Sequence, residues 1–380
     1  MDKRVYLLTT ISFVVGMVEL IIGGILDLVA LDLGVSTGKA GLLITIFALV
    51  FGVSGPVLLF LTGKADRKHV TLVALLIFFI GNIVAIFSAT YSMLMLSRII
   101  SASSGALLVV LCLTLASHIS QPEYQGRAIG LVIMGISGSV VLGLPIGVSL
   151  GHAYGWRSPF ILVAILTLVL VVGVYLFFGK VPTKPPMSLK KQLDSLKNKK
   201  VLFGQLTTFF FLAGHFTLYG YLTPFVKTTM GFDGTWITIV YFVYGAAAVT
   251  GGGLGGIAAD KFGVRRTLLT TIVLLGICLL VMPYASFVFF WVVLVIWGVL
   301  SWAITPPVQS HLIQLSPETS DIQQSLNNAA LHLGIAFGTL VGSVVIERLS
   351  VEQNSLVGVL FVVLSLGAAL LSMQKDREVA

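Results

Sequence analysis

Twelve long apolar stretches occupy most of the chain and leave few residues for a soluble domain. Each has about 20 residues, the length that an α-helix needs to cross the ~30 Å hydrocarbon core of a bilayer. Lipid offers the backbone no hydrogen-bond partner, so a spanning segment must be helical or part of a closed barrel. We therefore predict an all-α membrane protein with twelve transmembrane helices, near residues 5–27, 41–62, 70–90, 93–116, 127–150, 158–178, 201–224, 236–258, 267–286, 288–311, 323–346 and 354–373.

Basic residues fall mainly on one side of these spans. The positive-inside rule assigns the loops richest in Lys and Arg to the cytoplasm. Four basic residues lie on the opposite side, and Arg98 falls within a span. The other 18 of the 23 lie on the side that both ends of the chain share: Lys3, Arg4, Lys64, Arg67, Lys68, Arg127, Lys180, Lys184, Lys190, Lys191, Lys197, Lys199, Lys200, Lys261, Arg265, Arg266, Lys375 and Arg377. We therefore expect both termini to be cytoplasmic.

Composition and motifs exclude several classes of protein. The net charge of +8 reflects the loop asymmetry and suits anionic lipid, so nucleic acid is not an expected partner. Cys112 and Cys278 fall within spans, which argues against a disulfide or a metal site. Gly251-x-Gly253-x-x-Gly256 formally matches a dinucleotide fingerprint, but it lies in a span without a βαβ unit, where close helix packing explains it better. Walker A sequences and paired catalytic carboxylates are missing, so we expect neither an enzyme nor a cofactor. The expected location is a prokaryotic cytoplasmic membrane.

A hydrophilic stretch divides the spans into two sets of six. Residues 179–200 are interrupted by prolines and then become basic, which is typical of a solvated linker. The leucine spacing within this stretch also allows a short amphipathic helix on the membrane surface. We predict one bundle over residues 1–178, this linker, and a second bundle over residues 201–380.

The two sets of six also resemble each other. An offset of about 196–198 residues places the loop 60–72 on 255–269 and Glu19 on His215. A parallel repeat of six helices is typical of transporters whose two bundles rock about a central site. The predicted fold is therefore two pseudo-symmetric six-helix bundles.

The cytoplasmic loops carry the first family resemblance. The loop after the eighth span resembles the loop motif of the major facilitator superfamily in Gly256, Asp260, Lys261, Gly263, Arg265 and Arg266. The loop after the second span keeps a compressed form of it in Gly63, Asp66, Arg67 and Lys68. An Asp beside a helix N-terminus and facing basic residues can latch one access state, although the basic residues could instead only anchor the topology. The residues expected in this latch are Asp66, Arg67, Asp260, Arg265 and Arg266.

The fifth span resembles a narrower branch of that superfamily. Its residues Gly135, Gly138, Gly143, Pro145 and Gly147 are similar to the antiporter motif of the drug:proton antiporters. The segment GWRSPF at 155–160 and the Arg98–Gly105 spacing resemble further motifs of this branch. Glycines at such spacing let helices pack closely and flex.

Four longer segments resemble purine base and nucleoside efflux pumps. Asp27-Leu28 departs from the Pro-Gln common after the first helix of that subgroup, which leaves the substrate open. The segments are VELIIGGIL (18–26), AGHFTLYGYLTPF (213–225), VIWGVLSWAITPPVQSHLI (295–313) and SDIQQSLNNAALHLGIAFG (320–338).

Ionisable side chains at membrane depth are costly, and most are functional. At ~1.5 Å per residue, Glu19 lies about 12 Å and Arg98 about 9 Å from the outer side. The matched depth predicts a Glu19–Arg98 pair that loads and releases a proton. The alternatives are a static ion pair that joins two helices and direct substrate binding by Glu19 without proton coupling. His215 has the depth of Glu19 in the second bundle and is a further candidate for proton coupling.

Aromatic and amide side chains of the second bundle are candidates for binding a flat heterocycle. Trp297, Ser301 and Thr305 share one helix face, and Pro306-Pro307 should interrupt the helix just beyond them. Stacking would supply affinity for a purine, and hydrogen bonds would orient it. The expected substrate-binding residues are Tyr219, Trp297, Ser301, Gln309, Asn328 and His332.

Proton-driven efflux of purine bases or nucleosides by alternating access is therefore the expected function. A multidrug or sugar efflux pump of the same fold is the first alternative. A proton symporter or a non-transporting membrane sensor is less favoured, because the fifth span points to antiport and no appended soluble domain is evident. The expected partners are a small molecule (a purine or a drug), protons and lipid, and a monomer is expected.

Overall fold

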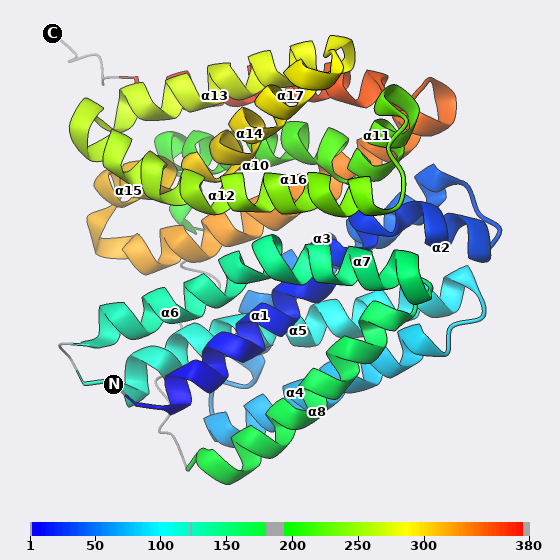
Figure 1. The fold of residues 1–380 in the computed structure, drawn as a ribbon. Helices are drawn as coiled ribbons and strands as arrows, with labels where there is room; N and C mark the ends of the chain where they lie inside the picture. The colour runs from blue at the N-terminus through cyan, green and yellow to red at the C-terminus, as the bar shows by residue number, and fades with distance from the viewer. Residues whose placement is uncertain (1, 122–123, 180–193, 375–380) are drawn as a thin grey trace, which may run out of the picture.

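A computed structural model of the protein describes residues 2–121, 124–179 and 194–374, and the described residues form helices without any β-strand (Figure 1). Twelve helical segments are long and apolar enough to cross a membrane, which confirms the predicted number. The α-helices are α1 (Arg4–Gly24), α2 (Leu26–Asp32), α3 (Thr37–Leu61), α4 (Arg67–Ile86), α5 (Tyr91–Ile119), α6 (Gln125–Gly138), α7 (Leu144–Tyr154), α8 (Ser158–Phe177), α10 (Lys199–Tyr219), α11 (Leu222–Met230), α12 (Thr235–Phe262), α13 (Val264–Val281), α14 (Phe287–Ala303), α15 (Thr305–Leu315), α16 (Ser320–Arg348) and α17 (Gln353–Ser372). Short helical turns are η2 (Ser139–Gly143), η3 (Met282–Tyr284) and η4 (Pro317–Thr319).

Four of the twelve spans are interrupted. The tenth span breaks between α14 and α15 at Ile304, just before Pro306-Pro307, whose missing N–H groups leave carbonyls without a helical partner. The fifth span contains the π-helical turn η2 ahead of Pro145. The first and seventh spans break after Gly24 and at Gly220. The short helices that follow these breaks, α2 from Leu26 and α11 from Leu222, begin 196 residues apart (222 − 26), the offset of the sequence repeat.

The helices before residue 179 pack mainly with each other, as do those after residue 198 (Figure 1). We propose that these two groups are the predicted bundles 1–178 and 201–380, and we call them the N-terminal and C-terminal helices. The expected linker 179–200 ends inside α10, and its residues 180–193, including most of the possible amphipathic helix, lie outside the described residues.

The two groups are closed against each other on the side away from Arg4 and Ser372, which the basic residues predict to be the outer side. Four polar contacts join their outer ends: Thr45 Oγ1 to Thr339 Oγ1 at 2.9 Å, Ser343 Oγ to the Gly38 carbonyl oxygen at 2.8 Å, Thr223 Oγ1 to the Gly23 carbonyl oxygen at 2.9 Å, and Lys227 Nζ to Asp27 Oδ2 at 2.6 Å. The protein is therefore closed to the outside in this conformation.

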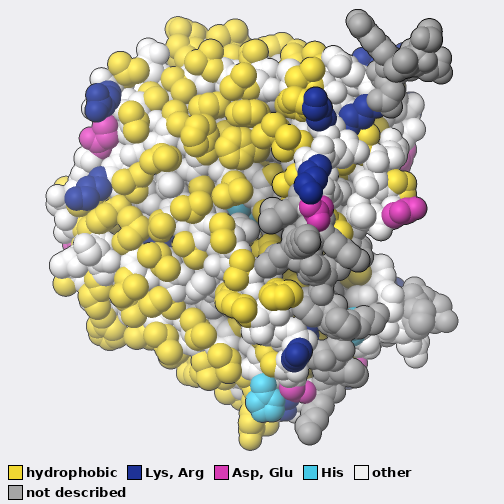
Figure 2. Space-filling model, turned by 180° about the vertical axis from the view of Figure 1, so that it is seen from behind, with side chains coloured by type: hydrophobic (Ala, Val, Ile, Leu, Met, Phe, Trp, Pro, Cys, Tyr) yellow, Lys and Arg dark blue, Asp and Glu magenta, His cyan; other side chains and the backbone are white. Residues whose placement is uncertain are grey.

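The surface along the sides of the spans suits a lipid environment. Large apolar side chains are exposed along most spans, among them Leu76, Val169 and Leu360. Figure 2 shows hydrophobic side chains over most of one face, with charged side chains mainly toward its two sides. Such a surface is stable in hydrocarbon but not in water.

Candidate functional site

The Glu19 carboxylate lies where the two groups of helices meet. Glu19 is on α1, and its Oε1 is 3.3 Å from Nδ1 of His332, which α16 supplies from the C-terminal helices. The Glu19 side chain is 19% exposed, whereas the next positions toward the outside, Ile22 and Gly23, are buried. The partly exposed carboxylate therefore lies on the cytoplasmic side of the contacts that close the outer ends.

Arg98 does not pair with the Glu19 carboxylate, so the predicted direct pair is wrong for this conformation. Within the described residues, the basic side chain within ion-pair distance of the Glu19 carboxylate is that of His332. Arg98 is fully buried on α5 and donates instead to backbone carbonyl oxygens. Its Nη1 bonds that of Val18 at 2.8 Å, and its Nη2 bonds that of Glu19 at 3.3 Å. Its Nε reaches the Leu43 carbonyl oxygen on α3 at 3.4 Å.

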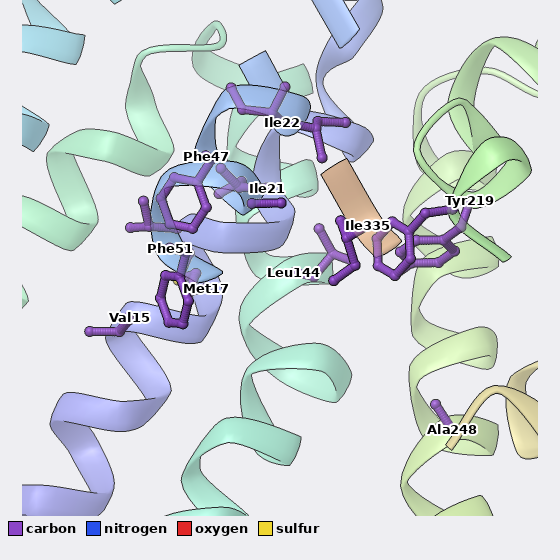
Figure 3. Packing of buried hydrophobic residues seen from close by; sticks show 14 of the residues in the cluster. Val15, Met17, Ile21, Ile22, Phe47, Phe51, Leu144, Tyr219, Ala248 and Ile335 are labelled. Atoms are coloured by element: carbon purple, nitrogen blue, oxygen red, sulfur yellow. The ribbon is translucent and has the colours of Figure 1, made fainter. Parts of the chain in front are cut away.

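These bonds make Arg98 a clamp on the helix that carries Glu19. The guanidinium carbon lies 4.0 Å from the centroid of the Phe47 ring, a cation–π distance. Figure 3 shows Phe47 and Phe51 beside α1, with Tyr219 on the opposite side and Leu144 and Ile335 between them. A buried charge is tolerated only when it is paired or hydrogen-bonded, and here backbone dipoles take that role. Arg98 therefore fixes the position of Glu19 and leaves its carboxylate free to meet the other bundle.

His215 lies in a separate hydrogen-bonded cluster within the C-terminal helices. Trp297 donates from Nε1 to His215 Nδ1 at 2.9 Å. His215 Nε2 lies 3.1 Å from the Tyr244 hydroxyl, which donates to Ser301 Oγ at 2.8 Å. Ser301 in turn donates to the Gly298 carbonyl oxygen at 2.7 Å. The predicted residues His215, Trp297 and Ser301 are thus brought together.

The direction of these bonds determines the state of the imidazole. Indole N–H can only donate, so His215 Nδ1 must accept and carries no proton. His215 is then the neutral tautomer that donates from Nε2 to Tyr244, which fits the donation from Tyr244 to Ser301. A second proton on His215 would have to displace the Trp297 bond. In this conformation the cluster favours a positioning role for His215 over proton exchange.

Tyr219 gives this cluster an unsatisfied polar group. Its ring stacks on His215 at a centroid distance of 5.1 Å and packs on Tyr244 at 4.7 Å. Its hydroxyl is buried and has no hydrogen-bond partner among the described residues. Buried hydroxyls nearly always have a partner, so this one is available to a ligand or a water molecule. Sequence reasoning missed Tyr241 and Tyr244 because their only signal was the i, i+3 spacing on a glycine-rich helix.

The remaining predicted substrate residues lie apart from this cluster. His332 contacts Phe51, with ring centroids 4.4 Å apart, and faces Glu19. Asn328, one turn toward the cytoplasm on the same helix, is exposed. Gln309 on α15 is half-buried and makes no hydrogen bond within the described residues. The six residues therefore form an aromatic group and an interfacial group, with two amides nearer the cytoplasmic side.

The antiporter-motif glycines form the surface on which α1 packs. A Cβ at Gly135 would overlap the Thr9 carbonyl oxygen, and one at Gly147 would overlap the Ile21 side chain. Gly138 faces Phe13, and Gly143 faces Met17. Pro145 cannot donate to a carbonyl in the preceding turn, which accounts for the π-helical widening at η2. The fifth span therefore packs closely on α1, and it does so around its π-helical turn η2.

Comparison with known proteins decides the family. The profile described as Major Facilitator Superfamily matches residues 8–339 and again 244–378. The chain belongs to the major facilitator superfamily. It is 35% identical to "Uncharacterized MFS-type transporter YbcL" of Bacillus subtilis (strain 168), over 99% of this chain and 97% of that one. It is 28% identical to "Inner membrane transport protein YdhP" of Escherichia coli (strain K12), over 97% and 95%.

Solved structures agree on the fold of this transporter. Two structures of a bacterial homolog of the human lysosomal transporter Spinster, both inward-facing, superpose with TM-scores of 0.80 (unoccupied) and 0.82 (occupied). They cover 98% and 97% of this chain, and 98% and 96% of their own, at 16% and 17% identity. At that identity they support the twelve-helix fold alone.

Outside the spans, the GWRSPF segment ties the outer ends of the N-terminal helices together. Asp32 Oδ2 accepts from Trp156 Nε1 at 2.9 Å and from Arg157 Nη1 at 2.8 Å. Arg157 also donates to the Ser88 carbonyl oxygen at 2.8 Å. The hydrogen bond from Trp156, followed by that from Arg157, lowers the pKa of Asp32, so this carboxylate stays ionised.

The two loops that carry the superfamily motif differ in their contacts in this conformation of the transporter. Asp66 caps α4 by accepting from the His69 N–H at 3.1 Å, and buried Arg67 reaches the Thr62 carbonyl oxygen at 3.5 Å. Asp260, Arg265 and Arg266 are exposed and line a shallow depression. No ion pair involves these three within the described residues, so the expected second latch is not formed here.

Asp260→Asn is expected to slow turnover several-fold and to leave substrate affinity unchanged. Asp260 has no ion partner among the described residues in this outside-closed state, so its charge can stabilise only the state in which the cytoplasmic ends meet. The expected effect is modest because an exposed ion pair contributes little free energy. Transport rate and substrate binding in detergent would separate the two effects. Glu318→Gln, an exposed acid before α16, is the control and should be silent. Lost affinity with normal turnover would refute the latch.

Proposed function

We propose that this transporter is a proton-coupled antiporter that exports purine bases or nucleosides by alternating access. The observation that carries the proposal is the Glu19 carboxylate: it lies inside a span, where the two groups of helices meet, and on the inner side of the contacts that close their outer ends. A carboxylate in such a place can bind a proton in one access state and release it in the other. The π-turn and close glycine packing beside α1 are consistent with the antiporter resemblance of the fifth span.

The cycle exchanges one proton for one substrate molecule. In the outside-closed state Glu19 loses its proton to the cytoplasm, and the ionised site then accepts the substrate. After the bundles rock, substrate leaves to the outside and a proton from outside restores the carboxyl group. All the residues involved lie on one chain, so a monomer in a bacterial plasma membrane is the proposed unit.

The side chains around the site favour a flat heterocycle with polar edges. Phe47 and Phe51 on α3, and Tyr219 in the C-terminal helices, are aromatic side chains on which a purine can stack once it replaces their present neighbours (Figure 3). The Glu19 carboxylate accepts from ring N–H groups, and the unsatisfied Tyr219 hydroxyl can donate to a ring nitrogen. The purine-pump resemblance of segments 18–26 and 213–225 covers both surfaces. Substrate-binding roles for Trp297, Ser301, Gln309, Asn328 and His332 remain part of the proposal.

Glu19→Gln is expected to abolish purine accumulation driven by a pH gradient while preserving substrate exchange without a gradient. Glutamine has the same shape but cannot take up a proton, so coupling is lost before binding is. Hypoxanthine and adenosine flux into proteoliposomes with an imposed pH gradient measures the effect, and Glu318→Gln serves as the matched exposed control.

Three outcomes separate the alternatives. Proton-driven dye or drug flux without purine flux would move the substrate to multidrug efflux. Purine movement in the same direction as protons would indicate symport. Gradient-driven flux that survives in Glu19→Gln at the rate of the unchanged protein would remove Glu19 from coupling.

A further inference from the structure

We propose that His332 is a second proton-coupling residue, which binds the transported proton jointly with Glu19 and thereby holds the outer side closed. This inference rests on the proposed proton coupling and adds a group that joins the proton to the movement of the bundles. Glu19 belongs to the N-terminal helices and His332 to the C-terminal helices, so the pair spans the surface that alternating access must open.

The contact is close but incompletely bonded. Nδ1 of His332 lies 3.3 Å from Glu19 Oε1, yet it makes no hydrogen bond, and His332 is only 5% exposed. A buried imidazole nitrogen beside a carboxylate without a bond is ready to take up a proton and donate it across the gap. The proton can rest on His332 beside ionised Glu19 or on Glu19 beside neutral His332, and the pair carries one proton in either form.

Few charged groups surround this pair. On α5, Arg98 lies behind Glu19 and bonds its carbonyl oxygen. On α3, the neighbours of His332 are Phe51 and Gly52, which do not titrate. The histidine of α10, His215, is held by Trp297 and Tyr244 within the C-terminal helices. The charge that His332 meets within the described residues is therefore mainly that of Glu19, with Arg98 as a fixed positive background.

The helix that carries His332 also carries part of the outer closure. Helix α16 bonds α3 through Thr45 and Thr339 and through Gly38 and Ser343. At Gly52, a Cβ would lie 3.0 Å from the Cβ of His332, so α16 approaches α3 closely at the level of the pair. Opening the outer side must separate these helices and pull His332 from Phe51 and Glu19.

Proton movement and conformation are thereby linked. With one proton on the pair, attraction between imidazolium and carboxylate favours the outside-closed state. Release of that proton to the cytoplasm removes the attraction, and the outer side can then open with substrate bound. Outside, a proton rejoins the separated groups and restores closure.

The test is the pH dependence of outer closure, measured by the distance between spin labels at Leu31→Cys and Leu349→Cys. Both positions are exposed at the outer ends of opposite bundles, and native Cys112 and Cys278 are buried. From pH 8 to pH 5 the ratio of closed to open molecules should rise about tenfold in the otherwise unchanged protein, the range over which histidine charges.

His332→Gln should remove most of this pH response. Glu19→Gln removes the other member of the pair and should also remove most of the pH response. Agreement between the two variants would show that the loss is not a folding defect of one of them. The double variant should be no worse than either single one. His311→Gln is the matched control, because His311 bonds Ser372 within the C-terminal helices at 2.8 Å.

A pH response that persists unchanged in His332→Gln would overturn this inference. Proteoliposome flux distinguishes that failure from failure of the proposed function. Proton-driven purine export with a normal response in His332→Gln would leave the function standing and remove His332. If both variants lose the pH response but the unchanged protein moves no purine, the Glu19–His332 pair would stand and the purine assignment would fall.

Discussion

Arg98→Ala is expected to abolish transport and to destabilise the protein markedly. The guanidinium is fully buried and bonds three backbone carbonyl oxygens, two of them on α1 and one on α3. Alanine leaves a cavity against Phe47 and removes the donors that position Glu19. Removing one partner from a buried charged network commonly costs about 3–5 kcal/mol. Flux under a pH gradient and the thermal unfolding midpoint in detergent measure the two effects.

Arg98→Lys separates charge from geometry. Lysine keeps the positive charge but cannot direct bonds to three separate carbonyl oxygens from one rigid plane. We expect it to recover stability in part and to transport at under about a tenth of the normal rate, because misplacement of a reacting group by 1 Å can cost about 100-fold. Arg348→Ala, an exposed arginine at the outer end of α16, is the neutral control. Full activity in Arg98→Lys would show that charge alone is required.

Gly251→Ala is expected to lower the unfolding midpoint by several degrees, whereas Gly252→Ala should leave it unchanged or raise it slightly. A Cβ at Gly251 would overlap the Val299 carbonyl oxygen of α14, and backbone cannot move aside. Overpacking of this kind typically costs about 1–3 kcal/mol. Gly252 has no atom within 4 Å of its Cβ position, and alanine favours a helix by up to about 1 kcal/mol relative to glycine.

The two adjacent substitutions control for each other. Both glycines belong to one GGG run of α12, and both variants add the same methyl group. Fluorescence-detected size-exclusion after heating reports both midpoints on small samples. Equal midpoints for the two variants would contradict the close packing of α12 on α14.

Much of the fold followed from residue type and spacing. The twelve spans were predictable because about 20 apolar residues in lipid can form little else. A break near Pro306-Pro307 was predictable because proline cannot continue the backbone ladder, but it occurs at Ile304, so Thr305 begins α15 instead of sharing a helix with Trp297 and Ser301. The breaks after Gly24 and at Gly220 were missed: no proline follows the first, and Pro224, which follows the second, was not used as a signal. They occur where the bundles meet, with Thr223 bonded to the Gly23 carbonyl oxygen, a contact set by tertiary packing.

The candidate site was only partly predictable. Depth along a helix placed Glu19 and Arg98 at one level, but depth does not determine which way each side chain turns. Arg98 turned to carbonyl oxygens, and the Glu19 carboxylate turned to His332 on the other bundle. The repeat pairs Glu19 with His215 in the sequence, but the donors around His215 could not be read from the sequence.

The buried Arg98 also has an electrical consequence. Its charge is fixed beside Glu19, so the empty site, with Glu19 ionised, is neutral overall. In the proposed cycle, one added proton makes the site +1, whether it rests on Glu19 or His332, and a neutral purine leaves it at zero. The membrane voltage would therefore act on the proton-loaded movement alone, at about 2.3 kcal/mol per 100 mV. In an energised, inside-negative cell, the voltage would drive the return of the proton-loaded site, and the rate of the purine-loaded export step would not depend on voltage.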